Sequence, residues 1–533
     1  MHMATSLVNL DALIPREDFE NVEGTADWPS IERLPIRDLE KKTFFYNAVR
    51  KPDFQRETAN WSPEKITDFV QTFLDGDLIP AIILWKSGKN IFVIDGAHRL
   101  SALIAWVQDD YGDGRESRSF FENNIPTEQQ AAAEATRRLI RRRLGTYAEY
   151  TTAEEHPAQS RPEVLARARR LASLALQLQW VSGDAKKAEA SFFKINQEAT
   201  PIDATELRIL QSRNAPNALA ARAIIRGGTG HKYWQKFDDE KRLEIEILAE
   251  EIHNNLFKPP LNLPLKTLDI PIAGRGYSAR TLPLIFDLVN LANDEKVVDA
   301  TRGKTPPVVV VDDDGASTIR YLKNTRRTTY RISGVNAASL GLHPAVYFYS
   351  LNGRYQPTAF LAVVSLIRDL ERRDAFIQFT NVRRRFEDFI LTHKTFPNQV
   401  ALKFGSGVKG YERLKNIYDH VLGQLKVGTS DSEIERSLLA NRQFDFLVMN
   451  PAEGSQRRKV FDSETKSAVF LKQALEQPLR CRICNCLIHE NSITVDHIVR
   501  KADGGIAVVD NGQLAHPFCN TGYKESQHAT VSA

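Results

Sequence analysis

Hydrophobic residues recur at helical spacing in the first clearly periodic stretch of the chain. The apolar positions of this stretch are Ile66, Phe69, Val70, Phe73 and Leu74. Ser62-Pro63-Glu64 precedes them and Gly76 follows them, and these residue types commonly begin and end a helix. The pattern therefore predicts a helix over residues 62–75.

The next two apolar runs, at residues 79–85 and 91–94, are short and rich in β-branched residues. A turn signal at Ser87-Gly88 separates them, so they are predicted to be neighbouring strands. The second run leads directly into Asp95-Gly96-Ala97-His98-Arg99, after which apolar residues resume helical spacing. A strand, a tight glycine turn and a helix N-terminus favour anion binding, because free backbone N–H groups point at the ligand.

Two roles are open for the charged residues of this turn. Arg99 is suited to a bidentate phosphate contact, and Asp95 to holding a metal or a water. The structural alternative is an internal salt bridge among Asp95, Arg56 and Arg99, since such pairs occur without function.

Most of the chain after residue 215 shows helical spacing. The clearest stretches are residues 283–293, 357–371, 375–391 and 410–425. A run at residues 306–311 predicts a strand, and the acidic triplet Asp312-Asp313-Asp314 after it predicts a solvated turn, with a cation site as the alternative. We expect residues 216–470 to form a helical connector that offers a basic surface to DNA. Residues 1–35 have no clear period and are expected to form a loosely attached arm.

Length and composition narrow the class of protein. A chain of 533 residues exceeds one core and predicts three or four domains. The net charge of +4 is small, but arginines and lysines cluster at residues 137–143, 326–331, 383–385 and 457–459. These clusters fit phosphate contacts, with a solvated helix face as the alternative for each. The longest apolar run, at residues 359–367, is too short to span a bilayer, so no membrane partner is expected.

All four cysteines lie near the C-terminus, within residues 481–519. Cys481 and Cys484 have the spacing that lets two thiolates of one knuckle reach the same ion, and His516 and Cys519 repeat it. Together these four residues predict a tetrahedral Cys3His site, and soft sulfur ligands in a closed site favour a structural Zn2+. Cys486 is interpreted as a small buried hydrophobe. Cysteines used as metal ligands indicate a reducing compartment, so we expect a cytoplasmic protein.

Harder ligands lie between and after these cysteines. They are Asp496-His497-Ile498, Gly504-Gly505, Asn511 and Asn520. With the CxxC knuckle, this order resembles the HNH endonuclease family and its ββα-metal finger. The resemblance implies that His497 is the general base, that Asp496 and Asn520 bind one Mg2+ or Mn2+ ion, and that Asn511 holds the loop and orients His497. His516 in place of a cysteine and Asn520 in place of a histidine depart from the family, but both keep metal-binding atoms.

The N-terminal region resembles a second family. Pro52-Asp53-Phe54-Gln55-Arg56, the turn at residues 95–99, and the segment ASFFKINQEATPIDATELR at residues 190–208 are similar to the ParB/sulfiredoxin-like N-terminal domain of GmrSD-type restriction proteins. The resemblance covers about residues 36–215. It implies a phosphate, nucleotide or DNA site that contains the residues Gln55, Arg56, Asp95, Gly96, His98, Arg99 and Asn196. The sequence DGAHR departs from the family's DGQQR, which leaves open whether the site hydrolyses an NTP or only binds phosphate.

The combined expectation is an α+β multidomain protein. It has a ParB-like α/β domain at residues 36–215, a mainly helical region at 216–470 and an HNH zinc finger at 471–533. The predicted function is metal-dependent endonuclease action on foreign or modified double-stranded DNA in bacterial defence, gated by the N-terminal domain. A homodimer is expected because one finger cuts one strand, and co-encoded defence proteins are possible partners. The alternatives are a DNA-binding regulator with a structural zinc finger, and an NTPase whose chemistry is N-terminal.

Overall fold

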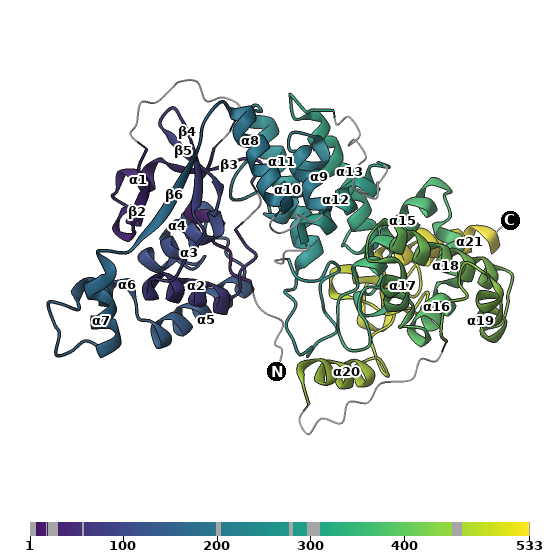
Figure 1. Ribbon diagram of the computed structural model, residues 1–533. Coiled ribbons are helices and arrows are strands. Elements are labelled where there is room, and N and C mark those ends of the chain that lie inside the picture. Colours follow the sequence, from purple (N-terminus) through teal and green to yellow (C-terminus); the bar gives the residue numbers. More distant parts are fainter. Residues whose placement is uncertain are drawn as a thin grey trace.

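The computed structural model (Figure 1) describes residues 7–17, 19, 30–55, 58–198, 204–276, 281–295, 310–449 and 461–531. In it, the two predicted strands at residues 79–85 and 91–94 lie side by side. Among the sequence-based predictions, Arg56, the side chain of Asn196, most of the expected strand at 306–311 and the basic residues 457–459 lie outside the described residues.

A six-stranded mixed sheet forms the centre of the N-terminal domain. Its strands follow the order β1 (Arg16–Glu17), β3 (Val49–Pro52), β5 (Asn90–Asp95), β4 (Ile82–Ser87), β6 (Ala175–Val181) and β2 (Arg33–Pro35). The strands β4 and β5 form the predicted antiparallel hairpin, and β3 runs parallel to β5. The ends of β3 and β5 therefore bring Gln55 and Asp95 to the same edge of the sheet.

Both faces of this sheet are covered by helices, as the sequence pattern of β5 requires. Ile91 and Val93 face one apolar core, whereas Phe92 and Ile94 face another, which is the alternation expected of a strand buried on both sides. The predicted helix is α2, whose Ser62 side chain accepts a hydrogen bond from the Lys65 backbone N–H. The helices of the domain are α1 (Phe44–Ala48), α2 (Pro63–Asp75), α3 (Ala97–Gln108), α4 (Arg115–Phe120), α5 (Thr127–Arg143), α6 (Tyr147–Thr152), α7 (Pro162–Leu171) and α8 (Ala185–Glu198).

The first described residues are an integral part of this domain. Val8, Leu13 and Ile14 are fully buried in its core, and β1 extends the sheet by pairing in parallel with β3. The interpretation of a loosely attached arm is therefore wrong for residues 7–17. The apolar residues of this segment are spaced too irregularly to predict a helix or a strand. Apolar side chains can nevertheless be buried from irregular chain, as they are here.

The region after the sheet domain is helical, as predicted. Its helices are α9 (Ala204–Gln211), α10 (Pro216–Ile225), α11 (Asp239–Phe257), α12 (Thr281–Ala292), α13 (Ala316–Ile332), α14 (Pro344–Tyr347), α15 (Pro357–Arg372), α16 (Phe376–Thr392), α17 (Phe396–Phe404), α18 (Val408–Lys426), α19 (Asp431–Ala440) and α20 (Ser463–Ala474). The four helices predicted from spacing are α12, α15, α16 and α18. Asp312 is buried and caps α13 by accepting hydrogen bonds from the backbone of Gly315 and Thr318, so it is neither a solvated turn residue nor a free cation ligand.

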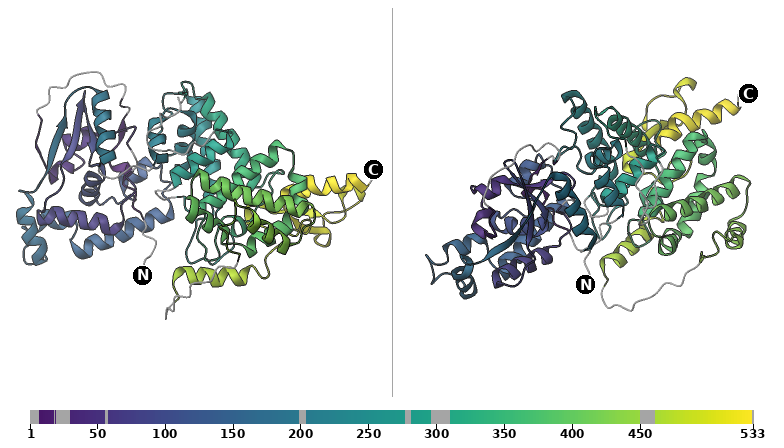
Figure 2. Two further views of the ribbon diagram at one scale, coloured as in Figure 1. Left: turned by 45° about the vertical axis from the view of Figure 1, so that its right-hand side comes forward. Right: turned by 45° about the horizontal axis from the view of Figure 1, so that its top comes forward.

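The C-terminal residues form a small ββα unit. The strands β7 (Thr494–His497) and β8 (Gly512–Ala515) pair antiparallel. A π-helical turn η6 (Cys519–Tyr523) follows, and α21 (Lys524–Val531) is the last described element. Both views of Figure 2 place this finger at the end of the helical region that lies away from the sheet domain. Among the described residues, no helix combines the length and apolar character needed to cross a membrane.

The finger is docked firmly on the helical region. The Ser492 hydroxyl accepts a hydrogen bond from the Gly334 backbone N–H at 2.7 Å and donates one to the Gly334 carbonyl at 2.9 Å. Phe518 N donates to the Ser339 carbonyl, and a Cβ on Gly341 would lie only 2.5 Å from the His516 ring. The finger therefore shares a surface with the helical region.

Candidate metal centre and nuclease site

Four soft ligands meet in the finger. One ligand atom from each of Cys481, Cys484, His516 and Cys519 lies within 4.8 Å of all the others. The first two belong to a tight knuckle, in which Asn485 adopts the left-handed conformation and donates its backbone N–H to the Cys481 carbonyl. A hydrogen bond between the side chains of Cys481 and Cys484 holds the pKa of the Cys484 thiol far below its usual value.

The orientation of His516 suits metal binding through one ring nitrogen. Its Nε2 lies 2.8 Å from the Leu487 carbonyl, and its Nδ1 lies 3.4 Å from the Cys484 sulfur. Because Nε2 donates to the carbonyl, the lone pair of Nδ1 faces the thiols, which is the arrangement that fixes the tautomer of metal-bound histidines. Four buried soft donors at this separation fit a closed tetrahedral zinc site. Cys486 is also fully buried, but its sulfur faces the Cys484 carbonyl.

The predicted catalytic carboxylate is buried and already paired with a cation. Asp496 on β7 is 5% exposed. Lys524, the first residue of α21, places its Nζ at 3.0 and 2.8 Å from the two Asp496 carboxylate oxygens, and Gln513 donates to Oδ2 at 2.7 Å. The Lys524 ammonium also donates to the His497 main-chain carbonyl. The sequence analysis missed Lys524. The π-helical turn before it, a feature often found at functional sites, is visible only in the structure.

His497 lies next to this ion pair, on the last position of β7. It is half-buried, and its Nε2 is buried with no hydrogen-bond partner among the described residues. The side-chain nitrogen of Asn520 lies 3.5 Å from both Thr494 Oγ1 and the Val495 carbonyl. Asn520 and Lys524 therefore face the same strand as Asp496 and His497, from consecutive turns at the helix start.

Asn511 closes the loop that follows His497. Its Oδ1 accepts from Val499 N at 2.7 Å, and its Nδ2 donates to the carbonyls of Val499 and Ile506 at 3.1 and 2.9 Å. Gly505 lies so close to this loop that a Cβ would come within 1.9 Å of the Val499 carbonyl oxygen. The asparagine and the glycine thus hold the backbone directly after His497 in one conformation.

The N-terminal turn has the predicted strand, glycine and helix, with its charged residues paired to each other. Arg99 Nη2 lies 2.6 Å from Asp95 Oδ2, as the structural alternative predicts for this pair; its third member, Arg56, lies outside the described residues. Gly96 has a φ of 96°, and a Cβ there would meet the Ile82 side chain at 2.6 Å. The His98 ring stacks on Trp61. Gln55 is buried at the same sheet edge, and its backbone carbonyl accepts a hydrogen bond from Arg16.

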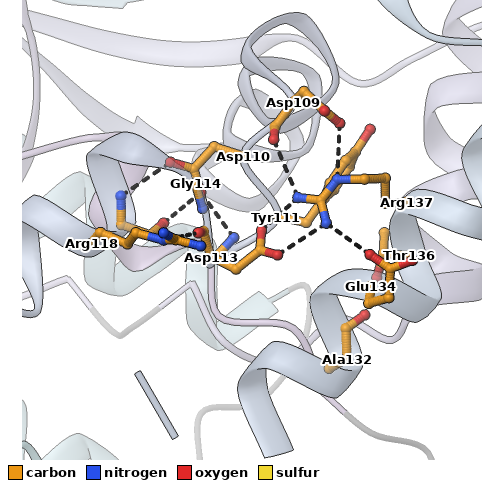
Figure 3. Close-up of polar contacts among 12 residues, drawn as sticks. Asp109, Asp110, Tyr111, Asp113, Gly114, Arg118, Ala132, Glu134, Thr136 and Arg137 are labelled. Atoms are coloured by element: carbon orange, nitrogen blue, oxygen red, sulfur yellow. Dashed lines mark hydrogen bonds and ion pairs between the residues drawn. The ribbon is translucent and has the colours of Figure 1, made fainter. Parts of the chain in front are cut away.

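Two of the basic clusters are used within the protein. Figure 3 shows Arg137 surrounded by Asp109, Asp113 and Glu134, with ion-pair distances of 3.2, 2.6 and 3.2 Å. Arg383 is 1% exposed and bonds to Glu387 and to two main-chain carbonyls. The prediction of phosphate contacts is therefore wrong for Arg383, whose guanidinium is enclosed, and Arg137 already has three carboxylate partners.

Two known protein families match this chain, one in its N-terminal region and one near its C-terminus. Residues 36–210 match the family GmrSD restriction endonuclease, N-terminal domain, and residues 481–526 match the HNH endonuclease family. Among curated proteins and solved structures, no match to this chain was found. The two family matches support a DNA-cleaving hydrolase of a restriction system. The chain thus combines an N-terminal GmrSD restriction endonuclease domain with a C-terminal HNH endonuclease domain.

Proposed function

We propose that the protein is a metal-dependent DNA endonuclease in which His497 is the general base. The observation that supports this proposal best is that, among the described residues, the buried Nε2 of His497 has no hydrogen-bond partner. The buried Asp496 directly precedes His497 in β7. A histidine suits the role because its ordinary pKa lies near neutral pH. In this proposal, neutral His497 takes a proton from the water that attacks the scissile phosphate.

The neighbouring residues would position His497 and hold a cation. Asn511 fixes the backbone at Val499, two residues after His497, and the Lys524 ammonium donates a hydrogen bond to the main-chain carbonyl of His497. Asp496 and Asn520 offer the hard oxygen ligands that Mg2+ or Mn2+ prefers. When bound, such an ion offsets the charge that develops on the phosphorane and on the leaving oxygen. Because Lys524 already pairs with Asp496, it must release this carboxylate before both oxygens become available.

The four soft ligands have a structural role in this proposal. Zinc bound by Cys481, Cys484, His516 and Cys519 would fasten the knuckle to the start of the helix that carries Asn520. The finger holds His497 and Asp496 on a two-stranded sheet too small to be stable by itself. Zinc and the docking surface around Ser492 would supply the missing stability.

The N-terminal domain is proposed as the gate that restricts cutting to foreign or modified DNA. The site would be the turn at residues 95–99 together with Gln55, which lies at the same sheet edge. Binding of a nucleotide or of a modified DNA segment would separate the Asp95–Arg99 pair and free the guanidinium for a phosphate. Cutting both strands would require two copies of the chain, and action in the cytoplasm would keep the thiols reduced for zinc.

Nicking of supercoiled plasmid tests the proposal. The zinc-loaded full chain is incubated with Mg2+ or Mn2+ and with modified or unmodified plasmid, with and without NTP. We expect nicking by the wild type and by the control His156→Ala, which changes an exposed histidine of the N-terminal domain, and none by His497→Ala. DNA binding without nicking by the wild type, under every divalent ion tried, would instead identify a DNA-binding regulator.

A further inference from the structure

A cavity lies where the sheet domain meets the first helices of the helical region. Its volume is about 110 Å³, and its wall includes Gln55 from the sheet domain, Arg222 and Arg226 around the end of α10, and Tyr233 from the following loop. The residues Asp95 to Arg99 of the N-terminal turn are not among the described residues that line it. The cavity is therefore a separate feature at the junction of the two regions.

Two polar groups in this wall are buried without a hydrogen bond. Among the described residues, neither Nη1 of Arg222 nor Oε1 of Gln55 has a partner, and the two residues are only 3% and 6% exposed. The Arg222 guanidinium lies over the ring of Tyr233, 4.1 Å from its centroid, which holds it in place. A buried polar group without a partner is unfavourable, so a ligand that hydrogen-bonds to both groups would gain two favourable contacts.

Positive charge is concentrated around the same cavity. The Asp11 carboxylate accepts contacts from Arg16 at 2.8 Å, Lys51 at 2.7 Å and Arg226 at 3.3 Å, and Arg222 adds a fourth cation nearby. Asp11, Arg16 and Lys51 are 5% exposed or less. Among the described residues, one carboxylate thus faces three cations, and Asp53 also acts on Arg222 but is itself paired with Arg213. The remaining positive charge would stabilise an anion there.

Two ionisable groups near the cavity have lowered pKa values because they are buried. Burial, followed by the charges of Arg16 and Arg226, lowers the pKa of His231 to about 2. Burial also lowers the pKa of Lys51 to about 8, although Asp11 acts in the opposite direction. Burial is the main cause of both shifts, and only for His231 do the neighbouring arginines add clearly to it.

We propose that this cavity binds an oxyanion of the size of a phosphate group, held by Arg222 and Arg226 with Gln55. The arginine forks donate to the oxygens of the anion, and the Gln55 carbonyl accepts from a protonated oxygen, as in hydrogen phosphate. A cavity of about 150 Å³ accommodates a benzene ring, so 110 Å³ suits a phosphate group and excludes an entire nucleotide. A phosphate on a larger molecule would leave the remainder outside.

The bound anion would connect two regions of the chain. Gln55 follows strand β3 of the sheet domain, whereas Arg222 belongs to the helical region on which the finger is docked. Arg222 also lies beyond residues 36–210, which match the N-terminal family domain. The inference shares Gln55 with the proposed gate but needs neither His497 nor the Asp95–Arg99 turn. Loss of binding in Arg222→Met therefore tests this cavity separately from the gate and from the proposed nuclease activity.

Calorimetric titration of the full chain tests the site. The probes are inorganic phosphate, AMP, and an oligonucleotide with either a 5′-phosphate or a 5′-hydroxyl end. We expect at least one phosphate-bearing probe to bind the wild type and to bind Arg222→Met at least tenfold more weakly. Arg37→Met is the matched control: it removes an exposed arginine of the sheet domain and should bind that probe like the wild type. Arg99→Met is measured alongside it to report on the N-terminal turn.

The pattern across probes identifies the source of the phosphate. Binding of inorganic phosphate indicates a free ion, a preference for AMP indicates a nucleotide, and a preference for the 5′-phosphate over the 5′-hydroxyl end indicates a DNA terminus. If Arg222→Met does not fold, Arg222→Lys and Gln55→Leu are measured, and each should weaken binding. The proposal is overturned if no probe binds the wild type, or if binding depends on Arg99 but not on these residues.

Discussion

Replacing Lys524 with methionine should make the finger bind divalent ions more tightly. The Lys524 ammonium contacts both oxygens of Asp496 and the main-chain oxygen of His497. The lysine side chain is 13% exposed and the aspartate side chain 6%, so solvent screens this pair weakly. A divalent ion that uses Asp496 has to displace the ammonium. Methionine retains most of the aliphatic length of lysine but removes the competing charge.

The size of the effect follows from the contacts that the ion must break. Hydrogen bonds to a charged group in such a setting contribute about 1.5–3 kcal/mol. Taking about 2 kcal/mol for the Lys524–Asp496 contact, and about 1.4 kcal/mol for each tenfold change in affinity, Lys524→Met should lower the dissociation constant for the ion roughly 30-fold. The metal-free variant should also be less stable, because its buried Asp496 carboxylate loses its charged partner.

Calorimetric binding of Mn2+ to the zinc-loaded chain, without DNA, measures this affinity separately from catalysis. The matched control is Lys501→Met, which removes an exposed lysine of the same finger and should bind Mn2+ like the wild type. An unchanged or weaker affinity in Lys524→Met would show that the ammonium does not compete with the ion, and the assignment of Asp496 as its ligand would then be wrong.

Two further changes test the buried clusters. Cys481→Ser should release zinc and unfold the finger, whereas Cys486→Ser should keep it, as measured by zinc content and thermal melting; equal zinc content in both variants would contradict the ligand assignment. Asp11→Asn should destabilise the sheet domain by about 3–5 kcal/mol by leaving buried cations uncompensated, or roughly 10 °C in Tm, while exposed Asp77→Asn should not. Burial raises the pKa of Asp11, but Arg16, Lys51 and Arg226 together hold it well below 3.8. A carboxylate with a lowered pKa stabilises the fold above its unfolded pKa, so the difference between Asp11→Asn and the wild type should be full above about pH 4 and shrink as the pH falls further. A pH-independent difference would refute this explanation.

The local elements of the chain could be predicted because their causes are local. The helix α2 follows from Ser62, Gly76 and the apolar spacing between them, and the β4–β5 hairpin follows from two apolar runs around a glycine turn. In the finger, two pairs of ligands with short internal spacing were enough to predict that the four would meet. The helix, the hairpin and each ligand pair depend on residues close together in the chain, although the two ligand pairs are themselves 32 residues apart.

The contacts that sequence reasoning missed join residues far apart in the chain. Lys524 reaches Asp496 only because a π-helical turn sets the register of α21, and no spacing rule predicts that register. Ser492 binds Gly334 from a position 158 residues away. Arg383 resembled a surface phosphate contact in sequence, yet it lies beneath the finger, where it bonds to the carbonyls of Leu340 and Gly341. Arginine runs alone do not reveal which members the fold encloses.

The central claim is that His497 removes the proton from the attacking water, and the single-turnover rate of plasmid nicking tests it most directly. A general base contributes about 10²- to 10⁴-fold to a rate. The account therefore predicts that His497→Ala nicks at least 100-fold more slowly than the wild type at saturating Mg2+, with equal zinc content and equal melting temperature. A rate within a few-fold of the wild type, from a folded and zinc-loaded variant, would contradict it.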